Sequence, residues 1–108
     1  MTADTQVQIK SMVDQHRILL FMKGNPDQPQ CGFSSVVANI LKDSGIPFAA
    51  FDVLSDPAIR QGIKEFGNWP TIPQLYVDGE LIGGCDVVRD YYERGELEAI
   101  LKGQAEPS

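Results

Sequence analysis

The sequence has 108 residues, of which 43% are hydrophobic, and its formal net charge at pH 7 is −6. A chain of this length can bury one hydrophobic core but not two, so we expect a single domain over residues 1–108, with a core over about 5–102 and a polar tail over 103–108. The acidic charge, without any run of Lys or Arg, opposes nucleic acid binding. We expect no membrane segment either, because no apolar run approaches the roughly 20 residues that cross a bilayer.

The start of the chain has neither a basic segment nor an apolar segment of the kind that forms a signal peptide. A cytoplasmic location is therefore the default expectation, and an organelle stays open if a presequence has been removed. Two cysteines, Cys31 and Cys85, are too few for a disulfide scaffold. Their reactivity therefore matters more than cross-linking.

The first part of the chain predicts a helix, a strand and a loop. Apolar residues recur at helical spacing over about residues 5–15, and His16 continues this stripe as a structural residue. The apolar run Ile18–Met22 is typical of a strand that is buried on both faces. Residues 24–30 contain two prolines and a glycine, which argues against regular structure and predicts a loop.

The middle of the chain repeats the alternation of helix and strand. A helix is expected to begin almost at Cys31 and to end near Ser44, where the following glycine supplies a left-handed cap. Residues 48–53 predict a second apolar strand. Asp56 and Pro57 then predict the N-cap and the first turn of another helix.

The last part of the chain predicts a hairpin and two helices. Residues 75–77 and 80–82 flank Asp78-Gly79, a turn that joins antiparallel strands. Helices are expected over 87–95 and 97–101. Together the elements predict an α/β fold of the thioredoxin-like type, a mixed four-stranded sheet with helices on both faces and its first two strands parallel.

Cys31 is the candidate reactive residue because it lies at the start of a predicted helix, where free N–H groups and the helix dipole favour an anion. Such sites lower a thiol pKa from about 8.5, sometimes to roughly 3.5–7.5. Ser34 stands where a dithiol oxidoreductase has its second cysteine, so an outside thiol such as glutathione must clear a mixed disulfide at Cys31. The tetrapeptide alone also fits an unreactive, buried cysteine.

Five short motifs follow one another along the chain. They are Lys23-Gly24, Pro26 with Pro29, Cys31-Gly32-Phe33-Ser34, Trp69-Pro70-Thr71-Ile72-Pro73-Gln74, and Gly83-Gly84-Cys85-Asp86. In this order they resemble the signature of monothiol glutaredoxins of the Cys-Gly-Phe-Ser class. The resemblance extends over about residues 9–101 without an evident gap, and it implies a thioredoxin-like fold that binds glutathione.

The resemblance implies a cis peptide bond before Pro73. In the family, the residue before this proline offers its backbone to the cysteinyl part of glutathione, a role that carries over to Ile72, with Thr71 beside it. Most X-Pro bonds are trans, with only about 5–6% cis in folded proteins. The Trp-Pro-Thr-Ile-Pro context reverses that expectation.

The resemblance implies further glutathione contacts from two kinds of residue, cationic side chains and residues at the start of a predicted helix. Lys23 and Arg60 are placed near the glycyl carboxylate, whereas Lys64, four residues after Arg60, is interpreted as a solvated charge. At the γ-glutamyl end, the resemblance implies contacts to Gly84, Cys85 and Asp86. Asp86 would accept a hydrogen bond from the α-ammonium group, and it also fits a simple N-cap.

Cys85 is interpreted as a packing residue, and a disulfide with Cys31 stays open.

A [2Fe–2S] cluster needs four thiolates, and one chain offers Cys31 and the sulfur of a bound glutathione. Two chains and two glutathiones complete the set, in agreement with the resemblance, which implies a homodimer bridged by a labile cluster with Cys31 as metal ligand in each subunit. Transfer to apo iron–sulfur proteins follows as a hypothesis, and the resemblance also implies a BolA-like partner.

Two other functions use the same residues. A glutathione-dependent thiol–disulfide oxidoreductase would use Cys31 as its catalytic nucleophile, although the missing second cysteine and the loop over 24–30 resemble the class with weak activity. A redox-silent thioredoxin-like adapter would not need the thiol at all. Substitution of Cys31 separates this adapter from the cluster carrier.

Overall fold

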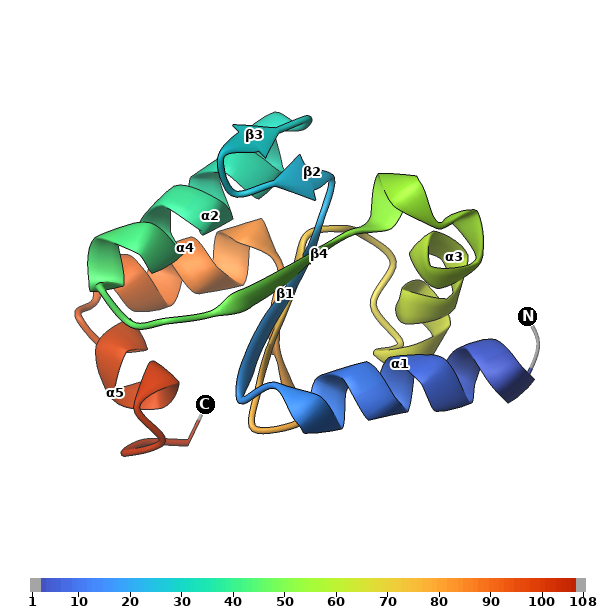
Figure 1. The fold of residues 1–108 in the computed structure, drawn as a ribbon. Helices are drawn as coiled ribbons and strands as arrows, with labels where there is room; N and C mark the ends of the chain where they lie inside the picture. The colour runs from blue at the N-terminus through green and yellow to red at the C-terminus, as the bar shows by residue number, and fades with distance from the viewer. Residues whose placement is uncertain (1–2, 107–108) are drawn as a thin grey trace.

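A four-stranded sheet forms the centre of the computed structural model, which describes residues 3–106 (Figure 1). The strand order is β4-β1-β5-β6. The strands are β1 (Ile18–Met22), β4 (Ala49–Asp52), β5 (Gln74–Val77) and β6 (Glu80–Gly83). β1 pairs parallel with β4 and antiparallel with β5, and β5 pairs antiparallel with β6. The predicted α/β fold with a mixed four-stranded sheet is therefore confirmed.

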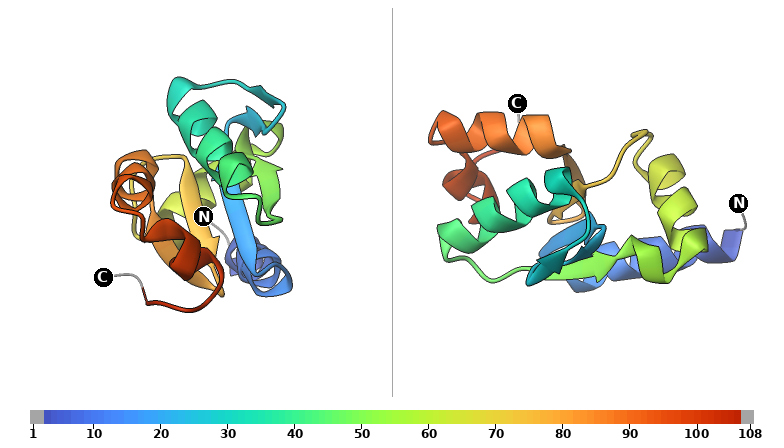
Figure 2. Two further views of the ribbon diagram at one scale, coloured as in Figure 1. Left: turned by 90° about the vertical axis from the view of Figure 1, so that its left-hand side faces the viewer. Right: turned by 90° about the horizontal axis from the view of Figure 1, so that it is seen from above.

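Helices cover both faces of the sheet (Figures 1 and 2). One layer holds α1 (Ala3–Gln15) and α3 (Pro57–Phe66), which contact each other, and the other holds α2 (Gly32–Ser44) and α4 (Cys85–Glu93), followed by α5 (Leu97–Leu101). Within residues 3–106 no helix has the length and apolar character needed to cross a membrane. The start of the chain at 1–2 and the last two residues of the expected tail, 107–108, lie outside the described residues.

The central strand β1 is buried along its whole length because it contributes to two cores. Leu19 and Phe21 pack in the core under α1 and α3. Ile18, Leu20 and Met22 pack in the core under α2 and α4. This alternation explains why the sequence shows a continuous apolar run and not an alternating pattern.

The loop predicted over residues 24–30 contains regular structure, which corrects the sequence interpretation. β2 (Gly24–Asn25) and β3 (Gln28–Pro29) form a two-stranded antiparallel ladder. The Asn25 side-chain oxygen accepts from the N–H groups of Asp27 and Gln28, at 2.9 and 2.8 Å. A ladder this short needs few N–H donors, so one proline fits in its turn and the other at its end.

Two further sequence interpretations are wrong in detail. β4 is shorter than the strand predicted over 48–53, because the Asp52 carboxylate accepts from the Leu54 N–H and starts a 3₁₀ turn, η1 (Val53–Ser55). His16 is exposed and follows the end of α1, so it does not continue the buried face of that helix.

The predicted turn between the last two strands is confirmed. Asp78 and Gly79 both have positive φ, 52° and 81°, as a two-residue hairpin turn of the mirror-image type requires. β5 and β6 are thereby held antiparallel. The chain that leaves β6 enters α4 at the same end of the sheet as the start of α2 (Figure 1).

Candidate functional site

Cys31 occupies the N-cap position of α2, with an extended backbone at φ −155° and ψ 138°. Partial burial acts to raise the pKa of its thiol. The N–H groups of Ser34 and Phe33, the Ser34 hydroxyl and the charge of Lys23 act in the opposite direction, and their sum sets the pKa below its ordinary value. The direction agrees with the thiolate expected at a helix N-terminus.

Ser34 connects the end of β1 to the start of α2. Its side chain is fully buried, with 0% exposure, and its oxygen accepts a hydrogen bond from the Lys23 backbone N–H at 3.0 Å. The same hydroxyl interacts with the Cys31 thiol and acts to lower its pKa. In the sequence, Ser34 was interpreted only as the position of the missing second thiol, and this role was missed. A hydroxyl in the first turn of the predicted helix was the available signal.

The segment before β5 has the backbone that the resemblance implied, since the Ile72–Pro73 peptide bond is cis. Ile72 and Pro73 are both buried, and Thr71 is exposed. The segment is held by Gln74, whose side-chain Nε2 donates to the backbone oxygens of Trp69 at 3.0 Å and Thr71 at 3.2 Å. No role of Gln74 was predicted from the sequence.

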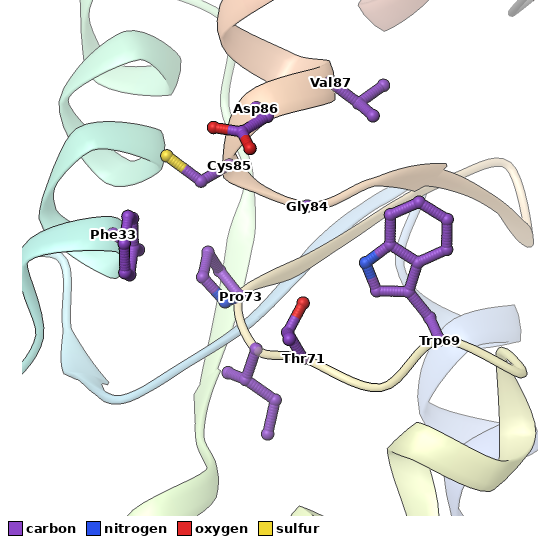
Figure 3. Close-up of a pocket in the computed structure, with 9 residues that line it drawn as sticks. Phe33, Trp69, Thr71, Pro73, Gly84, Cys85, Asp86 and Val87 are labelled. Carbon is purple, nitrogen blue, oxygen red and sulfur yellow. The ribbon is translucent and has the colours of Figure 1, made fainter.

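A cavity of about 210 Å³ lies between this segment and the start of α4 (Figure 3). Its lining residues are Phe33, Trp69, Thr71, Ile72, Pro73, Gly84, Cys85, Asp86 and Val87. Six of the residues assigned to glutathione from the sequence are thus brought together here, over two segments that are separated along the chain. Cys31 lies at the neighbouring helix start, and only Phe33 of its motif lines the cavity.

Gly84 allows the start of α4 to approach the segment before β5. A Cβ at this position would lie 3.1 Å from the Trp69 Nε1 and 3.2 Å from the Pro73 carbonyl oxygen. α4 begins at the next residue, Cys85, so its first N–H groups lie at the edge of the cavity. N–H groups at a helix start suit a carboxylate ligand.

The two thiols of the chain have opposite electrostatic environments. Cys85 is 8% exposed, and burial raises its pKa; the charge of Arg89 acts to lower it, whereas Asp86 and Cys31 act to raise it. Cys31 is half-buried and its pKa is lowered. Thiolate chemistry is therefore favoured at Cys31, and Cys85 has the buried environment expected of a packing residue. Asp86 is exposed and pairs with Arg89 at 3.1 Å.

The structure brings only part of the predicted cationic group to the site. Lys23 is half-buried at the end of β1, and its charge contributes to the lowered pKa of Cys31. Arg60 is exposed on α3, and neither Arg60 nor Lys64 lines the cavity. Among residues 3–106, no group of three or more His, Cys, Asp or Glu side chains could hold a metal ion.

Comparison with known proteins places the chain in a family. Residues 18–82 match the family model described as Glutaredoxin. A protein from Synechocystis sp., named as a monothiol glutaredoxin, is 50% identical over 102 residues, which are 94% of this chain and 95% of that protein. The chain belongs to the monothiol glutaredoxin family.

Other relatives of this glutaredoxin are longer. Monothiol glutaredoxin-S11 of rice, Oryza sativa subsp. japonica, is 51% identical over 94 residues, which are 87% of this chain but 19% of the rice protein. The chain therefore spans about a fifth of the length of that relative. The solution structure of reduced apo GrxS14 from poplar matches with a TM-score of 0.79 and 44% identity, over 92% of this chain and 91% of the poplar chain.

Replacement of Ser34 by Ala tests the electrostatic account of Cys31. The variant loses the hydroxyl that acts to lower the pKa of Cys31, so we expect this pKa to rise and alkylation by iodoacetamide to reach its half-maximal rate at a higher pH. The partly buried Lys23 N–H also loses its acceptor, which should lower the free energy of unfolding by about 1–3 kcal/mol.

Ser35→Ala is the matched control for Ser34→Ala, because the Ser35 hydroxyl accepts from the exposed Asn39 amide, at 3.4 Å. Its alkylation profile should coincide with that of the wild type. Identical profiles for Ser34→Ala and wild type would show that the hydroxyl does not stabilise the thiolate.

Proposed function

We propose that this glutaredoxin binds glutathione in the cavity beside Cys31 and assembles a [2Fe–2S] cluster between two subunits for transfer to apo-proteins. The observation that carries the proposal is a half-buried thiol of lowered pKa at a helix start, next to a cavity edged by a cis-proline segment and a second helix start. Each part of glutathione has a complementary group there.

The cysteinyl part of the tripeptide fits the backbone of Ile72, which offers main-chain groups in the way that an open strand edge does. The γ-glutamyl carboxylate fits the N–H groups at the start of α4, and the adjacent α-ammonium fits the exposed Asp86 carboxylate. The glycyl carboxylate fits Lys23, with Arg60 as a longer-range cation from α3. This arrangement directs the glutathione sulfur toward Cys31.

The donor set of one chain fits a shared cluster and not a complete one. Cys31 is the thiol with a lowered pKa, whereas Cys85 is buried with a raised pKa, so each chain supplies one ready thiolate ligand. Four thiolates are required. Two chains and two bound glutathiones supply them, which makes the cluster a cargo held partly by exchangeable ligands.

The surface around Cys31 leaves room for a second subunit. A Cβ built on Gly32 meets no atom within 4 Å, and Phe33 is 63% exposed. An exposed aromatic side chain next to a metal-binding thiol can exclude water from a cluster once a partner covers it. This supports a cluster-bridged homodimer.

The proposal includes partners and a location that follow from the family pattern. The recipients are apo iron–sulfur proteins, a BolA-like protein can replace one subunit, and the cytoplasm is the place of action. The net charge of −6 argues against nucleic acid as a partner.

A second candidate function, reduction of glutathione mixed disulfides, is favoured by the lowered pKa of Cys31. The Cys31 thiolate would attack the glutathione sulfur of a protein mixed disulfide, forming a new disulfide and releasing the protein thiolate. A second glutathione thiolate would then attack this disulfide, giving oxidised glutathione and regenerating the Cys31 thiolate.

Anaerobic reconstitution with iron, sulfide and glutathione tests the carrier function. We expect a [2Fe–2S] absorption and circular dichroism spectrum to appear together with a dimer on size-exclusion chromatography, and only when glutathione is present. Cys31→Ser should abolish both. A colourless, monomeric wild type that rapidly reduces mixed disulfides would reject the carrier function in favour of the oxidoreductase.

Lys23→Gln tests the assignment of the glycyl carboxylate. Loss of a charged hydrogen-bond donor costs about 1.5 kcal/mol or more, so we expect glutathione binding measured by calorimetry to weaken about tenfold. Lys10→Gln changes the net charge equally at an exposed residue of α1 that pairs with Asp14 at 2.7 Å. Equal affinities for the two variants would contradict a direct role for Lys23.

A further inference from the structure

Gln74, the first residue of β5, is a fully buried amide with 0% exposure. Its Nε2 donates one hydrogen bond to the Trp69 carbonyl at 3.0 Å and one to the Thr71 carbonyl at 3.2 Å. Its Oε1 accepts from the Tyr76 hydroxyl at 2.9 Å. Both N–H donors of the amide are therefore used by the segment that lines the cavity.

The chemistry of the partners fixes the orientation of this amide. A backbone carbonyl can only accept a hydrogen bond, so the nitrogen of Gln74 must face Trp69 and Thr71. Burial raises the pKa of Tyr76 to about 12, so its hydroxyl stays protonated at neutral pH and donates to the amide oxygen. The amide orientation that the two carbonyls require is therefore the same one that lets the amide oxygen accept from Tyr76.

The hydrogen-bonded group is enclosed by tight packing. The Tyr76 ring contacts Phe21 edge to face, with centroids 5.7 Å apart, and Phe66 at 5.9 Å. Gly67 lies over the polar ends, where an added Cβ would collide with the Tyr76 hydroxyl and approach Gln74 Oε1 to 3.0 Å. A buried network in such surroundings has little freedom to rearrange.

The carbonyls that Gln74 holds belong to residues whose side chains line the cavity. Trp69 and Thr71 stand on the segment facing Gly84, and the Trp69 indole nitrogen and the Thr71 hydroxyl are turned toward the cavity (Figure 3). The Gln74 backbone is itself fixed in the sheet, in register with Phe21 of β1. Gln74 therefore contacts the cavity wall through its side-chain amide and the central strand through its backbone.

We propose that Gln74 is a positioning residue of the glutathione site, which holds the Trp69–Pro73 segment in the shape that receives the tripeptide. Gln74 does not line the cavity and acts through the carbonyls of Trp69 and Thr71. The inference rests on the proposed function for the identity of the ligand. The effect of Gln74 on the segment itself does not depend on that ligand.

Gln74→Leu removes all three side-chain hydrogen bonds with a side chain of similar size. Gln74→Glu keeps the shape but replaces the nitrogen that faces the two carbonyls by oxygen, and it provides a second test if the Leu variant does not fold. Ile63→Val is the matched control, since Ile63 is equally buried, at 0% exposure, in the core under α3 and does not line the cavity.

Two measurements are made at a temperature where circular dichroism shows every variant to be folded. The first is glutathione affinity by calorimetry, for which we expect at least a tenfold loss in both Gln74 variants and no more than a twofold change in Ile63→Val. The second is fluorescence of Trp69, the one tryptophan of the sequence, without glutathione. We expect a red-shifted emission and stronger acrylamide quenching in the Gln74 variants alone.

A folded Gln74 variant with wild-type affinity and wild-type fluorescence would overturn the inference, even if its unfolding midpoint were lowered. So would equal losses of affinity in the Gln74 variants and in Ile63→Val, because these would reflect general destabilisation. A wild type that binds no glutathione would reject the proposed function and the glutathione role of Gln74. The fluorescence result is then still decisive for whether Gln74 holds the segment.

Discussion

The reactive end of the molecule depends on the interactions of one buried group, the Ser34 hydroxyl. It is buried between the end of β1 and the first turn of α2, where it accepts from the Lys23 N–H and acts to lower the pKa of Cys31. Because the strand end and the helix start are fixed to each other, the thiol lies among N–H donors and near a cation. A second thiol at position 34 would not supply the same short, strong acceptor.

This junction also limits how the chain between β1 and α2 can fold. The Gln30 N–H donates to the Lys23 carbonyl at 2.9 Å, so the intervening residues must leave and return to nearly the same place. The Asp52 carboxylate fixes the start of this segment, because it accepts a hydrogen bond from the Gly24 N–H at 2.9 Å. A short hairpin, β2–β3, is a compact solution to these two constraints.

Much of the fold follows from the sequence because its elements have clear periodicity or punctuation. The run Ile18–Met22, the Asp78-Gly79 turn and the helix that starts after Cys31 each have a local physical signal. The hairpin over 24–29 has none, since two-residue strands show no period and prolines obscure them. β4 ends early because of one side chain, Asp52, whose capping bond needs the folded backbone to be recognised.

The site is predictable from the sequence to a smaller extent, and for a different reason. The family resemblance identified the residues that line the cavity, such as Thr71 and Asp86, because ligand-facing groups occur in recognisable motifs. The supporting groups, Ser34 and Gln74, act on backbone atoms of distant or neighbouring segments, and these contacts exist only in three dimensions. The resemblance also placed Arg60 near the glycyl carboxylate; it is exposed on α3 and does not line the cavity, so its assignment to glutathione stays a prediction.

We propose that glutathione binds where the start of α2, the cis-proline segment and the start of α4 meet. Titration of the ¹⁵N-labelled, reduced protein with glutathione, followed by amide chemical shifts, tests it most directly. We expect saturable shifts at Lys23, Cys31, Ile72 and Cys85, and none at the opposite end of α2 and α4, where the Tyr92 hydroxyl donates to the Asp43 carboxylate. Saturable shifts centred on Asp43 and Tyr92, or no saturable shifts at all, would contradict it.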